Sequence, residues 1–374
     1  MGASVLISGA GIAGSTLAYW LARKAFTVTL VEHAAGQRSS GHPVDVKGPA
    51  ADVVEQMGIM PELRAAATQV NRLAFVDADG RERGGFNMRT FQGSAGDREV
   101  EIARADLAAI LLSAAGANTE IRWGDTITEL TQTGDGVQVG FQHAEPERFD
   151  LVVGADGLHS TVRRLTFGPE ADFIRHMGMY VATVEVDRPI RDEHQVVMVN
   201  TPGRAFVVHP ASGTPGAAFM FRHPAVPGLD RSDLASHTRM VTQAFAGRLG
   251  CFSRYLDQLQ AADDLYFDSV SRVRLPHWST GHVTLLGDAA SSLSLFGDGS
   301  TLAIAGAHTL AEELARAPAD LPSAVARYEQ RHRVLVKRRQ RGFTASAMLL
   351  VPRSRGSIVI RDNLARLLGG RSHG

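Results

Sequence analysis

The first thirty residues constrain the fold more than any other part of the sequence. SVLISGAGIAGSTLAYWLARKAFTVTLVEH places a mostly apolar run at Ser4–Ser8, a glycine-rich turn, apolar residues at helical spacing over 13–24 and a second strand-like run over 26–31. Strand, tight turn, helix and strand form a βαβ unit, which is the building block of a parallel, doubly wound sheet. The sequence therefore predicts an α/β fold at the start of the chain.

The turn contains Gly9, Gly11 and Gly14 in the spacing GxGxxG. The first glycine permits a tight turn, the second lets the backbone approach a pyrophosphate, and the third lets the helix pack closely on the strand. The helix that begins there directs free N–H groups and the positive end of its dipole at phosphates. Glu32, at the end of the second strand, can accept hydrogen bonds from ribose hydroxyls. These features predict a dinucleotide cofactor but do not distinguish NAD from FAD.

The middle third of the chain differs from the two outer thirds. Between about 176 and 225, short apolar runs separated by Pro and Gly predict an antiparallel sheet. LAFVDADGRERGGFN predicts a hairpin that turns at Asp79-Gly80, and the patterns over 323–341 and in IVIRDNLARLLGG predict helices. We expect a discontinuous cofactor domain (1–72, 96–172 and 266–320), a β-sheet substrate domain (73–95 and 173–265) and a C-terminal helical segment (321–374).

The composition argues against several classes of protein. Lys+Arg and Asp+Glu both number 39, so there is no net charge to attract nucleic acid or an anionic membrane. One cysteine, Cys251, allows no internal disulfide and no thiolate metal cluster, and the histidines form no metal-binding spacing. The N-terminus has no basic region before its apolar run, and no apolar stretch is long enough to span a bilayer. We expect a soluble cytoplasmic protein without a metal.

A second glycine-rich turn, GDAASSLSLFGDGSTLAIAGA at 287–307, favours a flavin. It follows the apolar run VTLL and precedes a helix-like stretch. Asp288, at the end of the strand, can bond the ribityl hydroxyls. Gly297 and Gly299 let backbone N–H groups approach the isoalloxazine edge, and a helix opening near Ser300 points its dipole at the pyrimidine oxygen, where negative charge collects on reduction.

With these motifs in place, the chain resembles the class A FAD-dependent monooxygenases of the p-hydroxybenzoate hydroxylase fold. Within them it is most similar to the tetracycline-inactivating flavoprotein monooxygenases. GAGIAG with Glu32, the DG motif in GADGLHSTVRR and the GD motif in LLGDAA occur in the family's order, as do VDVKG, EIARADLAAIL and YFDSVSRVRLPHWSTGHV. The resemblance implies a Rossmann-like FAD-binding domain interrupted by an antiparallel β-sheet substrate domain, with C-terminal helices.

The resemblance also implies roles for individual residues. Glu32 would hold the adenosine ribose, Arg104 would reach the FAD, and Asp288 would contact the ribityl chain. Asp156 and Gly157 match the DG motif, which in the family supports both FAD and NAD(P)H. The residues expected to contact the cofactor are Gly9, Gly11, Ile12, Ala13, Gly14, Glu32, His33, Arg104, Asp156, Gly157, Asp288, Gly297, Gly299, Ser300 and Thr301.

The reaction implied by the resemblance takes place on the flavin. NADH or NADPH reduces FAD, O2 adds to give a C4a-hydroperoxide, and one oxygen atom passes to an aromatic or polyketide-like small molecule. No protein side chain is therefore assigned as catalytic. On the middle sheet, the substrate pocket is expected to include Val207, His209, Phe219 and Phe221, together with Phe296 from the glycine-rich turn. His209 could equally be a histidine satisfied in the core. We expect a monomer or a homodimer.

The chain departs from the family pattern after GDAA. The loop is one residue shorter, Leu295 stands where a proline is usual, and an acid, Asp298, lies between the two glycines. Asp298 either opposes an anionic reduced flavin or caps the following helix. Two alternatives to a monooxygenase therefore stay open. One is an FAD-binding protein of this fold without oxygenase activity, in a structural, cyclising, isomerising or ligand-sequestering role. The other is an NAD-dependent dehydrogenase that uses only the N-terminal motif.

Overall fold

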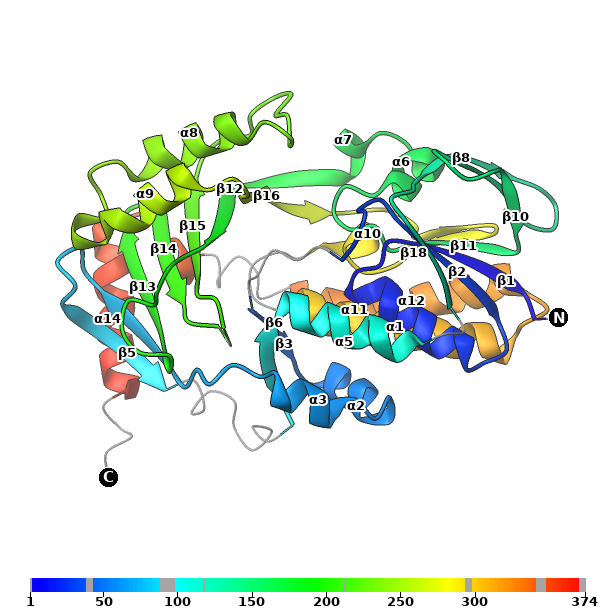
Figure 1. The fold of residues 1–374 in the computed structure, drawn as a ribbon, viewed down its shortest axis with the longest axis horizontal. Helices are drawn as coiled ribbons and strands as arrows, with labels where there is room; N and C mark the ends of the chain where they lie inside the picture. Colours follow the sequence, from blue (N-terminus) through cyan, green and yellow to red (C-terminus); the bar gives the residue numbers. More distant parts are fainter. Residues whose placement is uncertain are drawn as a thin grey trace.

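The structure is a computed structural model that describes residues 2–37, 43–87, 98–116, 119–211, 213–292, 298–340 and 348–369. Its two large sheets lie in separate halves of the molecule (Figure 1). The first sheet has six strands in the order β17-β18-β11-β1-β2-β7, parallel except for β17. The strands are β1 (Ser4–Ser8), β2 (Thr27–Glu32), β7 (Thr119–Trp123), β11 (Leu151–Gly154), β17 (Ser279–Thr280) and β18 (Val283–Leu285).

The predicted βαβ unit is confirmed, with α1 (Ile12–Ala22) connecting β1 to β2. Helix α1 packs between α5 (Arg104–Ala115) and α11 (Asp298–Arg316), and α11 also contacts α12 (Leu321–Gln340). The central strands β1 and β11 carry Val, Leu and Ile side chains on both faces and are almost wholly buried, because both faces of a parallel sheet are covered. Burial of these strands therefore holds the carboxyl end of β1 in place, and the glycine-rich turn begins at that end.

Two small sheets and several short helices complete this half. The predicted meander is a three-stranded sheet of β8 (Ile127–Gln132), β9 (Val137–Phe141) and β10 (Glu147–Phe149). A two-stranded sheet pairs β3 (Pro43–Val46) with β6 (Val100–Ala103) and leads from the first half towards the second (Figure 1). The short helices are α2 (Pro49–Gln56), α3 (Met60–Ala65), α6 (Thr161–Phe167), α7 (Glu170–Phe173) and α10 (Asp288–Ser291).

The second half is built on a seven-stranded, mostly antiparallel sheet in the order β16-β12-β15-β14-β13-β4-β5. Helices α8 (Leu234–Phe245) and α9 (Ser253–Ala261) cover one face, and α14 (Arg355–Gly369) packs on β5 and β13 (Figure 1). A single 3-10 turn, η2 (Gly250–Phe252), precedes α9. The strands are β4 (Arg72–Val76), β5 (Glu82–Asn87), β12 (Ile174–Glu185), β13 (Gln195–Thr201), β14 (Arg204–His209), β15 (Gly216–Arg222) and β16 (Tyr266–Val273).

The pairing of β16 moves one expected boundary. We expected 266–320 to belong to the cofactor half, but β16 pairs with β12 in the seven-stranded sheet. The chain therefore returns from the seven-stranded sheet to the six-stranded sheet after Val273, where β16 ends and the path leads to β17 and β18. The C-terminal segment is also divided between the halves, because α12 packs on α11 whereas α14 packs on β5. In the part of the chain that the structure describes, no helix combines the length and apolar character needed to cross a membrane.

Candidate functional site

The three glycines of the GxGxxG turn differ in why a residue without a side chain suits each position. Gly9 follows β1 with φ +103°, a conformation that L side chains rarely adopt. A Cβ on Gly14 would lie 1.9 Å from the carbonyl oxygen of Gly9, so this glycine is needed for the close packing of α1 on the turn. A Cβ on Gly11 would meet no atom within 4 Å. Gly11 is therefore not needed by the fold, and its backbone is open to a ligand, as a pyrophosphate site requires.

The N-terminus of α1 has the properties of an anion site. Its N-cap, Gly11, supplies no side-chain cap, and its first turn contains no acidic residue. The first N–H groups of a helix have no intrahelical acceptor, so here they are available to a phosphate. Glu32 closes the turn from the other side, because its carboxylate accepts the N–H groups of Ala10 and Ala34, each over 2.9 Å. A carboxylate has lone pairs left for a ribose after these two bonds. His33, the next residue, is exposed.

The GD motif lies directly against this turn. Gly287 has φ +63°, and a Cβ there would lie 2.9 Å from the Cβ of Ala13 in the first turn of α1. Asp288 is the first residue of α10, and the Cβ position of Gly299 in α11 is 3.9 Å from its Oδ1. The structure thus brings together the first turn of α1, the start of α10 and the start of α11, which are far apart in the sequence.

Asp288 and Arg104 form the charged centre of this arrangement. Burial raises the pKa of the Asp288 carboxyl, and the nearby charge of Arg104 opposes that rise only in part. Arg104 begins α5, at the point where β6 delivers the chain to this end of the sheet. Neither side chain makes a hydrogen bond to any residue within the described ranges. Among the described residues, their polar groups therefore have no side-chain hydrogen-bond partner that would compete with a cofactor.

The DG motif follows β11 and begins α6. The Asp156 carboxylate accepts the Ser160 hydroxyl and the N–H groups of Thr161 and Val162, the latter two over 2.8 and 3.1 Å. Burial nevertheless raises the pKa of this carboxyl, against the effect of its hydrogen bonds. Gly157 has φ +79° and would accommodate a Cβ without contact, so its backbone is open in the same way as that of Gly11. Asp156 therefore shapes the turn that presents Gly157.

Sequence reasoning missed the role of Arg163 in this motif. Its side chain is only 1% exposed, and it donates to the carbonyl oxygens of Leu158 over 2.6 Å and Ala289 over 3.0 Å. The first bond holds the DG turn and the second reaches α10 of the GD motif. An arginine inside the quoted motif was the only signal in the sequence. The two motifs are thus joined through one buried guanidinium.

Asp298 is the first residue of α11 and lies in an ionic cluster. Its Oδ1 pairs with Arg339 of α12 over 3.0 Å and with Lys47 over 3.5 Å, and Lys47 also pairs with Asp45 over 2.9 Å. This ionic cluster contains two acids and two bases, so the negative charge of Asp298 is balanced locally. Ser300 and Thr301 donate to the carbonyl oxygen of Asp45, and Thr301 also to that of Lys47, so their hydroxyls tie α11 to β3.

The expected substrate-side residues divide between the two faces of the seven-stranded sheet. Phe219 and Phe221 are 0% and 2% exposed and pack under α8 and α9. Val207 has the opposite parity and lies on the other face, with Met220. Alternation directs Phe219 and Phe221 into the helix-covered core, on the face of the sheet opposite to Val207. Phe296 and Gly297 lie outside the described residues.

His209 connects the two halves of the molecule. It is 7% exposed, its Nε2 lies 2.6 Å from the Glu101 carboxylate of β6, and its Nδ1 accepts the N–H of Ala211 over 2.9 Å. Because Nδ1 is an acceptor here, Nε2 carries the proton and donates to Glu101. His209 therefore belongs to an interface between β14 and β6, on the same face of the sheet as Val207.

The arrangement defines a class of protein before any comparison is made. A GxGxxG turn, an acid at the end of β2 and a second acid-bearing turn packed on the first form one continuous edge for an extended dinucleotide with a flavin end. The chain belongs to the FAD binding domain family, whose model matches residues 2–338. The family and the class inferred from the geometry therefore agree.

Comparisons with individual proteins agree with this assignment. A flavin-dependent monooxygenase from an unknown prokaryotic organism is 34% identical over 336 residues, which are 87% of this chain and 84% of the relative. The solved structure of tetracycline destructase Tet(51) is 29% identical with a TM-score of 0.84, covering 98% of this chain and 96% of that one. Klebsiella pneumoniae HpxO, complexed with FAD and uric acid, is 21% identical with a TM-score of 0.78, covering 99% of this chain and 94% of that one, and shares the fold.

Proposed function

We propose that this protein is an FAD-dependent monooxygenase that is reduced by NADH or NADPH and transfers one atom of O2 to an aromatic or polyketide-like small molecule. One observation carries the proposal. Gly287 of the GD motif packs against Ala13 of the GxGxxG turn, so two phosphate- and sugar-binding elements share one edge of the sheet. A nicotinamide dehydrogenase that used only the N-terminal motif would have no need of the second element.

The described residues fit FAD along this edge. The N–H groups at the start of α1 would hold the pyrophosphate, and Glu32 would accept the adenosine ribose. Asp288 would accept ribityl hydroxyls, with Arg104 beside it to bind the cofactor's polar groups. The backbones of Gly11, Gly157 and Gly299 would allow a close approach, and the residues expected around these contacts are Ile12, Ala13, Asp156, His33, Ser300 and Thr301.

Bound FAD would supply the electron transfer and oxygen activation, and the chain would supply position and exclusion of water. The apolar sheet face that carries Val207 would form the wall of the substrate site. Neighbours on that face are Phe75, Met179, Met198, Ala205, Ala218 and Met220. His209 would fix the geometry of this wall, since its ring is held by Glu101 and Ala211. This division of labour explains why no acid–base pair of side chains is needed for the oxygen transfer.

The relatives support the choice of substrate class. The chain is 29% identical, over nearly its full length, to a tetracycline destructase, a name that points to a polycyclic substrate. An apolar wall suits such a molecule, because most of its surface must leave water on binding. We therefore propose that the substrate is a sizeable fused-ring compound rather than a small polar metabolite.

The experiment is a stopped-flow measurement on the FAD-loaded protein. It is mixed anaerobically with NADPH or NADH, with and without a panel of fused-ring aromatic compounds, and the flavin absorbance is followed. We expect bleaching that at least one compound accelerates, and then, on admission of air, a product heavier by one oxygen atom. The protein without FAD is the control. Flavin that binds but is never reduced by either nicotinamide would refute the monooxygenase proposal and favour a non-oxygenating flavoprotein.

A further inference from the structure

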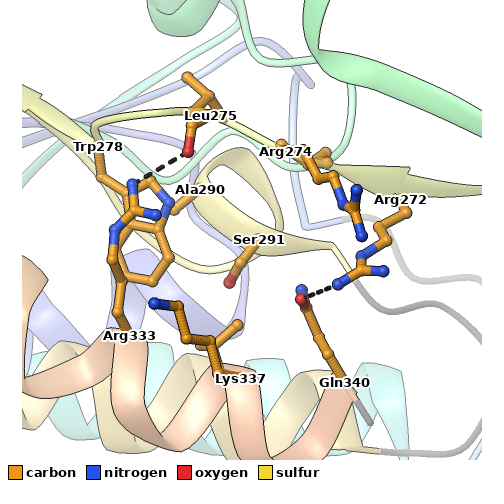
Figure 2. Close-up of a pocket in the computed structure, with 11 residues that line it drawn as sticks. Arg272, Arg274, Leu275, Trp278, Ala290, Ser291, Arg333, Lys337 and Gln340 are labelled. Carbon is orange, nitrogen blue, oxygen red and sulfur yellow. Dashed lines mark hydrogen bonds between the residues drawn. The ribbon is translucent and has the colours of Figure 1, made fainter.

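A basic pocket lies beside α10 (Figure 2), and none of its lining residues is assigned to the flavin in the proposal above. It has a volume of about 300 Å³ and is formed by the end of β16, by α10 and by the last turns of α12. Its polar lining consists of Arg272, Arg274, Arg333, Lys337, Ser291 and Gln340, and its apolar lining of Val273, Leu275, Trp278, Ala290 and Val336. No carboxylate is among these lining residues.

The four positively charged side chains of the pocket differ in how many hydrogen bonds and ion pairs they already make within the protein. Arg333 pairs with Glu329 over 2.8 Å, donates to the carbonyl oxygens of Leu275 and Pro276, and lies over the Trp278 ring at 4.5 Å. Arg272 donates to the Oε1 atom of Gln340, as Figure 2 shows, but its Nε is buried without a partner among the described residues.

The side chains of the remaining two cations, Arg274 and Lys337, make no hydrogen bond or ion pair within the described part of the chain. Both side chains are exposed at the mouth of the pocket. Together with Arg272, they leave three positive charges without a matching anion.

The chain geometry places two of these charges in one wall of the pocket. Arg272 lies near the end of β16, Arg274 directly follows that strand, and both residues line the pocket. Burial lowers the pKa of Arg272, and the like charge of Arg274 lowers it further. A bound anion would offset the unfavourable closeness of these two like charges.

We propose that this pocket binds a phosphate group, either free phosphate or the phosphate of a small molecule. Two guanidinium groups and an ammonium suit a compact anion with several acceptor oxygens. The Ser291 hydroxyl and the amide of Gln340 add neutral donors. A nucleobase is not the expected occupant, because the Trp278 ring is 3% exposed and is covered by Arg333, which leaves no stacking surface.

The pocket is physically connected to the expected flavin site. Ala290 and Ser291 belong to the same four-residue helix that begins with Asp288. A phosphate drawn against Ser291 would therefore restrain the helix that presents the Asp288 carboxylate. The binding proposal itself does not rest on the proposed reaction, since it concerns residues outside that edge of the sheet.

The test is a phosphate titration of the full-length, FAD-loaded protein without a reductant, with sodium chloride at matched ionic strength as reference. We expect a saturable rise in Tm of about 2 °C at a phosphate concentration ten times its Kd. Lys337→Ala and Arg274→Ala should each weaken phosphate binding by about tenfold, as for the loss of a charge-assisted hydrogen bond. Arg338→Ala is the matched control, because Arg338 is the exposed neighbour of Lys337 and does not line the pocket.

Two further ligands identify the source of the phosphate. NADP+ displacing bound phosphate at a lower concentration than NAD+ would assign the pocket to the 2′-phosphate of the nucleotide. If neither NADP+ nor NAD+ displaces the bound phosphate, the pocket would be assigned to free phosphate or to another small phosphate ester. The proposal is overturned if phosphate shifts the Tm no more than chloride does, or if Lys337→Ala and Arg338→Ala bind phosphate equally. Because no reductant is present, these outcomes are independent of whether the protein oxygenates a substrate.

Discussion

The guanidinium of Arg163 donates to the carbonyl oxygen of Ala289 over 3.0 Å, and this single bond joins the turn after β11 to the helix after β18. Both elements stand at the same edge of the six-stranded sheet, since β11 and β18 are neighbouring parallel strands. The DG and GD motifs are therefore one structural unit. Its rigidity depends on a charged side chain that the sheet and α10 remove almost completely from water.

Arg163→Met should destabilise the protein and loosen its hold on FAD. The substitution leaves the carbonyl oxygens of Leu158 and Ala289 without their donor, at a cost of about 3 kcal/mol for buried acceptors of a charged group. Urea unfolding of the FAD-free protein measures the stability, and the flavin-to-protein absorbance ratio measures retention. Arg164→Met, at the exposed neighbouring position, is the control and should change neither quantity. Equal unfolding midpoints for the two variants would remove the structural role assigned to Arg163.

Substitution of Gly14 by alanine should impair folding, whereas substitution of Gly11 by alanine should impair FAD binding alone. Gly14→Ala places a Cβ 1.9 Å from the backbone oxygen of Gly9, so it should cost about 4 kcal/mol or more, or prevent folding. Gly11 has φ −74° and open space around its Cβ position, so Gly11→Ala should leave the Tm of the FAD-free protein within about 1 °C. It should still weaken FAD binding by about tenfold, because the new methyl occupies the approach to the backbone. Unchanged FAD affinity in Gly11→Ala, measured by flavin fluorescence, would show that the cofactor does not approach this residue.

The sequence predicted the local features of the site better than its long-range pairings. The βαβ unit and the glycine turns follow from periodicity and from backbone chemistry within a few residues. The ion pairs of Asp298 with Lys47 and Arg339 depend on how α11 packs against β3 and α12, which no local pattern contains. Alternation also places Phe219 and Phe221 on one face of β15, but only the docking of α8 and α9 decides that this face is closed.

Asp288→Asn should improve the stability of the FAD-free protein while weakening its affinity for FAD. Burial raises the carboxyl pKa in the folded state above its unfolded value. An acid shifted upwards holds its proton more tightly in the folded state, so stability falls as the pH rises through the unfolded and then the folded pKa. At pH 7.5 the asparagine variant avoids the free-energy cost of burying a charged carboxylate. Its gain in stability over the unmodified protein should vanish below about pH 4, where the carboxyl is protonated in both states. Thermal unfolding across this pH range measures the effect, with the exposed Asp257→Asn as control. A variant that loses stability and keeps normal FAD affinity would contradict both parts.

Asp298→Asn tests whether the ionic cluster acts on the flavin. The substitution leaves Lys47 and Arg339 without their shared carboxylate partner at the start of α11. If this cluster faces the flavin, an uncompensated positive charge stabilises the reduced cofactor, and the two-electron potential should rise by about 30 mV. Lys47→Met should shift the potential in the opposite direction. Spectroelectrochemical titration of both variants gives the answer, and identical potentials in the two would place the cluster out of electrostatic reach of the flavin.

His159 should make the stability of the protein depend on pH near neutrality. Its Nδ1 lies 3.0 Å from Glu170 and its Nε2 lies 3.2 Å from Asp268, with Arg231 also against the ring. Burial alone would lower the pKa of this histidine, but the two carboxylates raise it overall. Because the folded-state pKa exceeds the unfolded value of about 6.5, the stabilisation is complete below that pH and is lost as the pH rises through the folded pKa.

His159→Gln should therefore lower the free energy of unfolding most at about pH 6, and the difference from the unmodified protein should shrink steadily above about pH 6.5. Urea unfolding of the FAD-free protein at intervals between pH 5.5 and about 9 measures this difference. Asp268→Asn should flatten the same dependence, because it removes one of the carboxylates that favour the charged ring. The double variant should add little to either single one, since both remove the same ion pair. A difference that grows with rising pH would mean that the histidine is neutral in the folded protein and that Glu170 pairs with Arg231 instead.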